Sequence, residues 1–241
     1  MRTNKMPHIK GFDEIETEIT RHPGKVALDE WANLSRIFID IYQRNRNELI
    51  NMLEEPSRND ELSIELFQNV RPPVIKNAYT NEVLRCIFNY LSSLSSLVDT
   101  GLRLTGKYSE AQLIEYNKHK DVLVSSNINA FFGKLRNYIQ HYGIPPLGWA
   151  IQLNNDMPDD CKYYLSREKL LEWSGWSSKA KLYINNGDVN LLKSIQEHGK
   201  MIDEAYRILI NISSQIHGDD IDAVNELIRR RNDILSGKIK L

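Results

Sequence analysis

The chain reads LRNYIQHYGIPP from residue 135 to residue 146. Apolar residues recur in this stretch at three- and four-residue spacings, the period of a helix with one buried face: Leu135, Tyr138, Ile139 and Tyr142. Gly143 and the two prolines after it are typical of a helix end. With Ser109 as a suitable N-cap, we expect one long amphipathic helix over residues 109–142.

The polar residues of this helix lie away from its apolar face. At about 100° per residue, Arg136 and His141 flank that face on opposite sides. Asn137 and Gln140 lie between them around the back of the helix. The cluster spans only about 7.5 Å along the axis. It is therefore expected to face solvent or a second subunit, and not the core of its own bundle.

Arg136, Asn137 and His141 carry functional groups suited to RNA cleavage without a metal ion. A guanidinium binds phosphate through two parallel hydrogen bonds, and an imidazole exchanges a proton near neutral pH. RNA supplies its own nucleophile, the 2′-hydroxyl. We therefore assign catalytic roles to these three residues and weaker substrate contacts to four neighbours: Lys134, Gln140, Tyr138 and Tyr142. Both tyrosines can stack on a base, but their angles also suit the edge of the core.

Helical periodicity dominates the rest of the chain. It predicts helices over residues 26–53, 81–104, 189–216 and 219–235, with a charged loop over 54–60. Two β-prone runs predict a hairpin at about residues 148–166, with its turn over 154–160. We predict a mainly α fold, an antiparallel helical bundle with a small β-hairpin insertion. Residues 1–70 are expected to form an N-terminal helical extension and residues 71–241 the bundle, together one compact unit.

The composition is typical of a soluble globular protein, with 41% hydrophobic and 26% charged residues. A net charge of -1 means that nucleic-acid binding would depend on a local basic patch. Cys86 and Cys161 have neither metal nor disulfide spacing. We find no apolar run near the roughly 20 residues that span a membrane and no apolar signal core at the start. We expect a cytoplasmic protein that needs no cofactor or metal.

Other patterns have simpler structural interpretations. Residues 101–108, GLRLTGKY, resemble a phosphate-binding P-loop, but Tyr108 replaces the Ser or Thr that binds magnesium, and the segment ends a helix. The run Arg229-Arg230-Arg231 is interpreted as a solvated helix face, with phosphate contact as the alternative. Four histidines have no clustered partners in the sequence and are interpreted as ordinary: His8, His22, His198 and His217.

The Arg136-Asn137…His141 pattern resembles the signature of the HEPN superfamily. That signature is an arginine, a polar residue that is often Asn, a few variable residues and a histidine, late in a helix of an all-α bundle. The resemblance covers about residues 81–146. It implies a metal-independent ribonuclease in which two motifs meet at a composite site in a homodimer. It also implies that Arg136 binds phosphate, that His141 is the general acid and base, and that Asn137 supports them.

These observations lead to two main hypotheses. The first is a HEPN-type endoribonuclease of phage defence or a toxin system, which leaves a 2′,3′-cyclic phosphate and has an antitoxin or defence partner. The second is a non-catalytic HEPN-like module that binds RNA, a nucleotide or a partner protein and uses the motif in dimer contacts. An unrelated helical protein, with Arg136 and His141 as surface residues, is the remaining alternative. None of the three involves a membrane.

Overall fold

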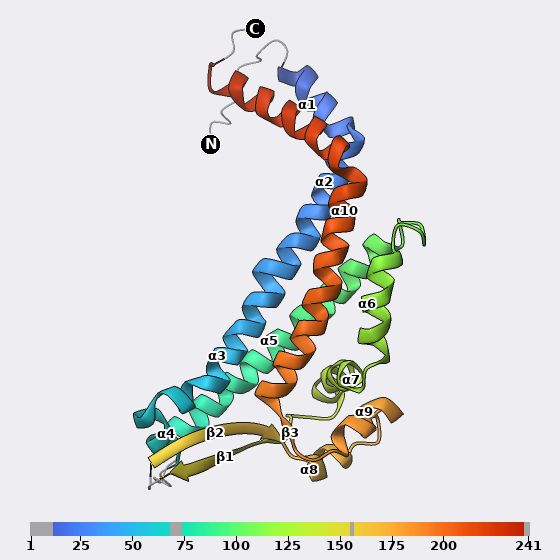
Figure 1. Cartoon of the computed structure of the whole chain (residues 1–241). Helices are drawn as coiled ribbons and strands as arrows, with labels where there is room; N and C mark the ends of the chain where they lie inside the picture. Colours follow the sequence, from blue (N-terminus) through green and yellow to red (C-terminus); the bar gives the residue numbers. More distant parts are fainter. Residues whose placement is uncertain (1–11, 68–73, 155–156, 239–241) are drawn as a thin grey trace. The chain divides into compact units, whose positions relative to one another are not determined.

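A computed structural model of the chain describes residues 12–67, 74–154 and 157–238 (Figure 1). The chain divides into two compact units. Unit 1 comprises Met1–Ser35 and Leu209–Leu241, and unit 2 comprises Arg36–Ile208. The candidate site residues at 134–142 all belong to unit 2.

The described residues of unit 1 form three helices. They are α1 (Phe12–Arg21), most of α2 (Pro23–Arg36) and the second half of α10 (Leu191–Leu235). Apolar residues of α1 and α10 form its core: Ile15, Ile19, Val224, Leu227 and Ile234. The guanidinium of Arg231 lies 3.1 Å from the Glu16 carboxylate at the edge of this core. Arg231 belongs to the basic run Arg229-Arg230-Arg231, which was interpreted as a solvated helix face. This member of the run forms an ion pair within the protein.

Unit 2 contains the remaining helices, which surround one aromatic-rich core. The helices are η1 (Ile37–Gln43), α3 (Arg44–Arg58), α4 (Asp60–Phe67), α5 (Val74–Thr105), α6 (Ile114–Ser125), α7 (Asn127–His141), α8 (Arg167–Leu171), α9 (Ser178–Ile184) and the first half of α10. Its largest fully buried side chains include Tyr42, Leu49, Tyr90, Phe131, Phe132 and Leu135. The apolar stripe of α7 is thus part of the core, which fixes the position of the helix that carries the predicted cluster.

A small antiparallel sheet has the strand order β1-β2-β3. Strands β1 (Leu147–Asn154) and β2 (Met157–Leu165) pair with Trp149 opposite Tyr163. The short β3 (Val189–Asn190) adds Val189 opposite Leu165. The predicted hairpin is confirmed, but its turn was expected over residues 154–160 and β2 already begins at Met157. The third strand was expected to be the start of a helix. The coarse prediction of a mainly α protein with a small β element is also confirmed.

The single helix predicted over residues 109–142 is wrong. Helix α6 ends at Ser125 and α7 begins at Asn127, because Ser126 has extended backbone angles of φ -72° and ψ 143°. Its hydroxyl accepts a hydrogen bond from the Asn129 backbone N–H, so Ser126 is the N-cap of α7. Because Ser126 starts a new helix, α7 can take a direction different from that of α6. The apolar periodicity of residues 109–142 gave no sign of this break.

Two other boundaries also differ from the predictions. The loop expected over residues 54–60 is mostly helical, because α3 continues through Pro56 to Arg58 and α4 starts at Asp60. Asn59 alone is extended, and its side-chain oxygen accepts a hydrogen bond from the Leu62 backbone N–H. The break expected near Gly218 is absent, since α10 runs without interruption from Leu191 to Leu235. One glycine inside a helical pattern lowers helix propensity without necessarily ending the helix.

Among the described residues, we find no helix that is both long and apolar enough to cross a membrane.

Candidate functional site

The last two turns of α7 carry the predicted catalytic cluster on the surface of unit 2. The side chains of Arg136 and His141 are exposed, and that of Asn137 is partly buried. No hydrogen bond or ion pair joins any of these three side chains to another residue that the structure describes. The side chains of Arg136 and His141 project about 140° apart around the helix axis. They are therefore available to a ligand, on a convex surface.

The four weaker candidates separate into exposed and buried side chains. Gln140 is exposed and Lys134 is partly buried, and both lie on the polar side of α7. The side chain of Tyr142 is 50% exposed, whereas that of Tyr138 is only 4% exposed. The Tyr138 ring stacks on Trp176 at 5.7 Å between centroids. Because Tyr138 has so little open surface, the structure places Tyr142, and not Tyr138, where a ligand can reach an aromatic ring.

An aromatic cluster holds α7 in place beneath its exposed side. Phe131 packs on Trp176 and on Tyr183 of α9, with ring centroids 5.6 and 5.2 Å apart. Trp176 donates a hydrogen bond from Nε1 to the Leu170 carbonyl oxygen, at 2.6 Å. Burial raises the pKa of Tyr138, and the nearby Tyr142 and Glu172 add to this effect. The end of α7 is thus supported by rigid rings.

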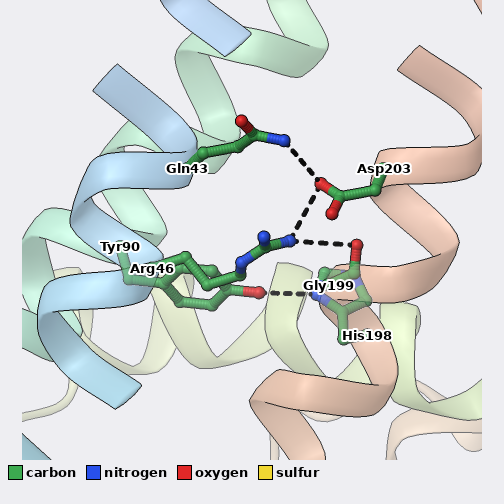
Figure 2. Close-up of polar contacts among 6 residues, drawn as sticks. All are labelled: Gln43, Arg46, Tyr90, His198, Gly199 and Asp203. Atoms are coloured by element: carbon green, nitrogen blue, oxygen red, sulfur yellow. Dashed lines mark hydrogen bonds and ion pairs between the residues drawn. The ribbon is translucent and has the colours of Figure 1, made fainter. Parts of the chain in front are cut away.

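A buried polar network lies near the other end of α7 (Figure 2). The Tyr90 hydroxyl on α5 and Nδ1 of His198 on α10 are 2.8 Å apart. The other ring nitrogen of His198, Nε2, lies 3.1 Å from Oδ1 of Asn129 in the first turn of α7. An amide oxygen can only accept, so Nε2 carries the proton and Nδ1 accepts from Tyr90. The His198 ring also stacks on Phe132 at 4.7 Å between centroids.

Burial fixes the charge state of this histidine. Desolvation, helped by the positive charge of Arg46, lowers the pKa of His198 to about 3. The imidazole therefore stays neutral at ordinary pH, with both nitrogens occupied. Such a group orients its neighbours but has no lone pair left for a substrate. His198 thus joins α5, α7 and α10.

An ion pair completes the network. Nη1 of Arg46 lies 2.9 Å from Oδ1 of Asp203 and also donates to the Gly199 carbonyl oxygen at 3.2 Å. Gln43 donates from Nε2 to the same Asp203 oxygen at 3.3 Å (Figure 2). Burial raises the pKa of the nearby Tyr42 hydroxyl to about 12, although Arg46 opposes this effect. The contacts tie η1 and α3 to α10.

The sequence did not predict this network, and His198 was interpreted as an ordinary histidine without clustered partners in the sequence. Its partners are 108 and 69 residues away in the chain, so no local motif could reveal them. One signal was present: His198 lies at helical spacing between Ile195 and Ile202, on the buried face of α10. A histidine on an apolar stripe is expected to be buried, and a buried imidazole needs hydrogen-bond partners.

Comparison of the chain with protein-family models, with curated proteins and with solved structures finds no match.

Proposed function

We propose that this protein is a metal-independent endoribonuclease of HEPN type that cuts single-stranded RNA at the end of α7. The observation that supports the proposal is the pair of exposed side chains, Arg136 and His141, that have no partner among the described residues. They lie five residues apart on a helix that an aromatic cluster holds in place. Catalytic groups on a rigid element need little reorganisation when substrate binds.

The proposed reaction is an internal transesterification. His141 accepts the proton of a 2′-hydroxyl, whose oxygen attacks the adjacent phosphorus while the bond from phosphorus to the 5′-oxygen breaks. The leaving 5′-oxygen takes up a proton, which gives a 5′-hydroxyl on one product and a 2′,3′-cyclic phosphate on the other. Arg136 binds the non-bridging oxygens and stabilises the negative charge of the phosphorane. Asn137 supports this arrangement by hydrogen bonding, and Lys134 and Gln140 contact the RNA backbone.

The proposal includes a homodimer. Arg136 and His141 diverge by about 140° on one convex helix surface, which makes it hard for both to reach a single phosphate from one chain. A second copy facing the first would place one chain's arginine beside the other chain's histidine. The resemblance to HEPN proteins favours the same arrangement. It also motivates a cytoplasmic role in phage defence or toxin function, with an antitoxin or defence-system protein as partner.

His198 is a poor candidate for the catalytic histidine. Its side chain is fully buried, and both ring nitrogens are engaged. With its pKa lowered to about 3, it has almost no tendency to take a proton at neutral pH. Of these two histidines, His141 alone is exposed to solvent.

The test is cleavage of a labelled mixed-sequence RNA in EDTA, with analysis of the product ends. We expect metal-free cutting that leaves cyclic phosphates. Arg136→Ala and His141→Ala should each slow it by roughly 100-fold to 10,000-fold, the usual range for a lost general acid–base group. His119→Ala is the matched control, because His119 is a partly exposed histidine on α6 that pairs with Glu115 and should not affect cleavage.

Two outcomes would contradict the proposal. Cutting by His141→Ala at the wild-type rate would rule out the assigned mechanism. Absence of cutting by a folded wild-type protein would favour the second hypothesis, a non-catalytic HEPN-like module that binds RNA, a nucleotide or a partner protein.

A further inference from the structure

Tyr142 presents an open aromatic ring immediately after His141. It is the C-cap residue of α7, and its side chain is 50% exposed. Its backbone N–H donates to the Tyr138 carbonyl oxygen at 2.8 Å, so the position of the residue is fixed by the end of the helix. The ring and the His141 imidazole leave the chain from adjacent Cα atoms, about 3.8 Å apart.

The buried side of the Tyr142 ring rests on other aromatic rings. Its centroid is 4.9 Å from that of Tyr138 and 6.4 Å from that of Trp173. Tyr138 and Trp173 are themselves packed edge to face at 5.5 Å. Because these rings restrict its motion, Tyr142 loses little conformational entropy when a further ring stacks on its open side. Trp173 had no predicted role at the site.

The charge of α7 favours an anionic ligand beside this ring. Its sequence, NINAFFGKLRNYIQH, contains Lys134, Arg136 and His141 but no aspartate or glutamate. Glu172 is an acidic group close to the neighbouring Tyr138, but it belongs to the segment after α8 and not to α7. An aromatic ring open on one side, on a helix that carries basic residues, is a combination that proteins use to bind single-stranded nucleic acid.

We infer that Tyr142 stacks on one unpaired nucleobase next to the phosphate that His141 of the same chain and Arg136 of the second copy hold. This inference rests on the proposed function, and it names the residue that selects single-stranded RNA: Tyr142 requires that the nucleotide at the cleavage site has its base free. In a duplex both faces of each base are covered by neighbours, so the ring excludes paired RNA. Loops, bulges and single strands are the substrates that this arrangement selects.

The test measures binding and stacking without cleavage. The probe is a short single-stranded RNA with one 2-aminopurine, whose fluorescence falls when the base stacks, and the protein carries His141→Ala to prevent turnover. Adding Tyr142→Ala should weaken binding about tenfold or more and abolish the fall in fluorescence. Adding Tyr142→Phe, which keeps the ring, should change affinity by no more than about twofold.

Ile144→Ala serves as the control for general apolar contact. This side chain is 70% exposed and lies two residues after Tyr142, so its loss should leave affinity and fluorescence unchanged. If Tyr142→Ala binds as tightly as its parent, or if the folded parent does not bind the probe, the inference is wrong. If stacking depends on Tyr142 but the wild type cuts no RNA, the proposed nuclease activity fails while the base-binding role stands.

Discussion

His198 and His141 belong to two regions of unit 2 that meet opposite ends of α7. The start of α7 contributes Asn129 to a buried network, in which His198 bonds to Tyr90 and Asn129. The end of α7 carries His141, which is exposed and has no described partner. Each region also contains an arginine: Arg46 is paired with Asp203, and Arg136 has no partner in the described part of the chain.

The comparison shows how environment decides what the same side chains do. In the network, Arg46, Asp203 and His198 each make hydrogen bonds to neighbours within the fold (Figure 2). Buried polar groups of this kind contribute specificity and rigidity, because any arrangement that leaves one unpaired is costly. The groups at the end of α7 contribute no such contacts. The proposed function assigns these groups to RNA instead.

Removing Asp203 should have the largest effect on stability. The side chains of Arg46 and Asp203 are only 13% and 18% exposed, so Asp203→Ala leaves a charge largely buried and uncompensated. We expect the free energy of unfolding to fall by about 3 kcal/mol, measured by urea denaturation. Arg136→Ala should leave it unchanged, because that side chain is exposed and unpaired.

The exposed pair of Lys118 and Glu115 provides a control for Asp203→Ala. Their side chains are 65% and 56% exposed, and Glu115→Ala should not shift the urea midpoint measurably. Equal losses from Asp203→Ala and Glu115→Ala would contradict the distinction between a buried network and solvated pairs. A large loss from Arg136→Ala would show that the end of α7 is itself part of the stabilising structure.

Acid should weaken the network through His198. Its pKa is about 3 in the folded chain and near its ordinary 6.5 when unfolded, so between these values the unfolded state binds more protons. Its contribution to stability is complete above pH 6.5 and decreases as the pH falls towards 3, by up to about 1.4 kcal/mol per pH unit. From pH 7 to pH 5 the wild type should lose about 2 kcal/mol that His198→Gln does not lose.

Urea denaturation of both proteins at the two pH values measures this difference. His198→Gln will be less stable at pH 7, so the quantity to compare is the change between pH values. All other titrating groups are common to the two proteins, so their contributions to this change cancel to first order. If the free energy of unfolding changed equally with pH in the wild type and in His198→Gln, burial would not be holding His198 neutral.

Local patterns predicted the end of α7 and the exposure of its polar residues better than they predicted the other helix boundaries. The end of α7 was placed correctly because apolar spacing and the Gly143-Ile144-Pro145 stop lie within one short stretch. The exposure of Arg136 and His141 followed from helix geometry alone. The start of α7 was missed, although Ser125-Ser126-Asn127 contains suitable N-cap residues, because the surrounding residues continue a helical pattern.

The network was beyond prediction from one sequence. Arg46 and Asp203 are 157 residues apart, and Tyr90 and His198 are 108 apart. Each lies in an ordinary helical segment, where helical periodicity shows which face is buried but not which helices meet. The pairing of long-range partners is a property of tertiary packing. Burial of His198 could be inferred from its apolar neighbours, but the identity of its partners could not.

The N-cap of α7 provides the smallest expected effect and tests whether the two ends of the helix are coupled. The Ser126 hydroxyl accepts from the Asn129 backbone N–H at 3.2 Å, on the same residue whose side chain bonds to His198. Ser126→Ala should lower the free energy of unfolding by about 1 kcal/mol, and Ser126→Asp should restore most of it. Ser125→Ala is the matched control, because the Ser125 hydroxyl bonds back to the Val122 carbonyl oxygen and caps nothing.

RNA binding by the same variants shows whether loss of the Ser126 cap affects only the start of α7 or also its end. The end of α7 is held by contacts of Tyr138 with Trp173 and Trp176, which do not involve Ser126. Ser126→Ala should therefore leave affinity for the single-stranded probe unchanged while stability falls. If Ser126→Ala also lost affinity for the probe, the buried network would help to position Arg136 and His141. The two ends of α7 would then be coupled.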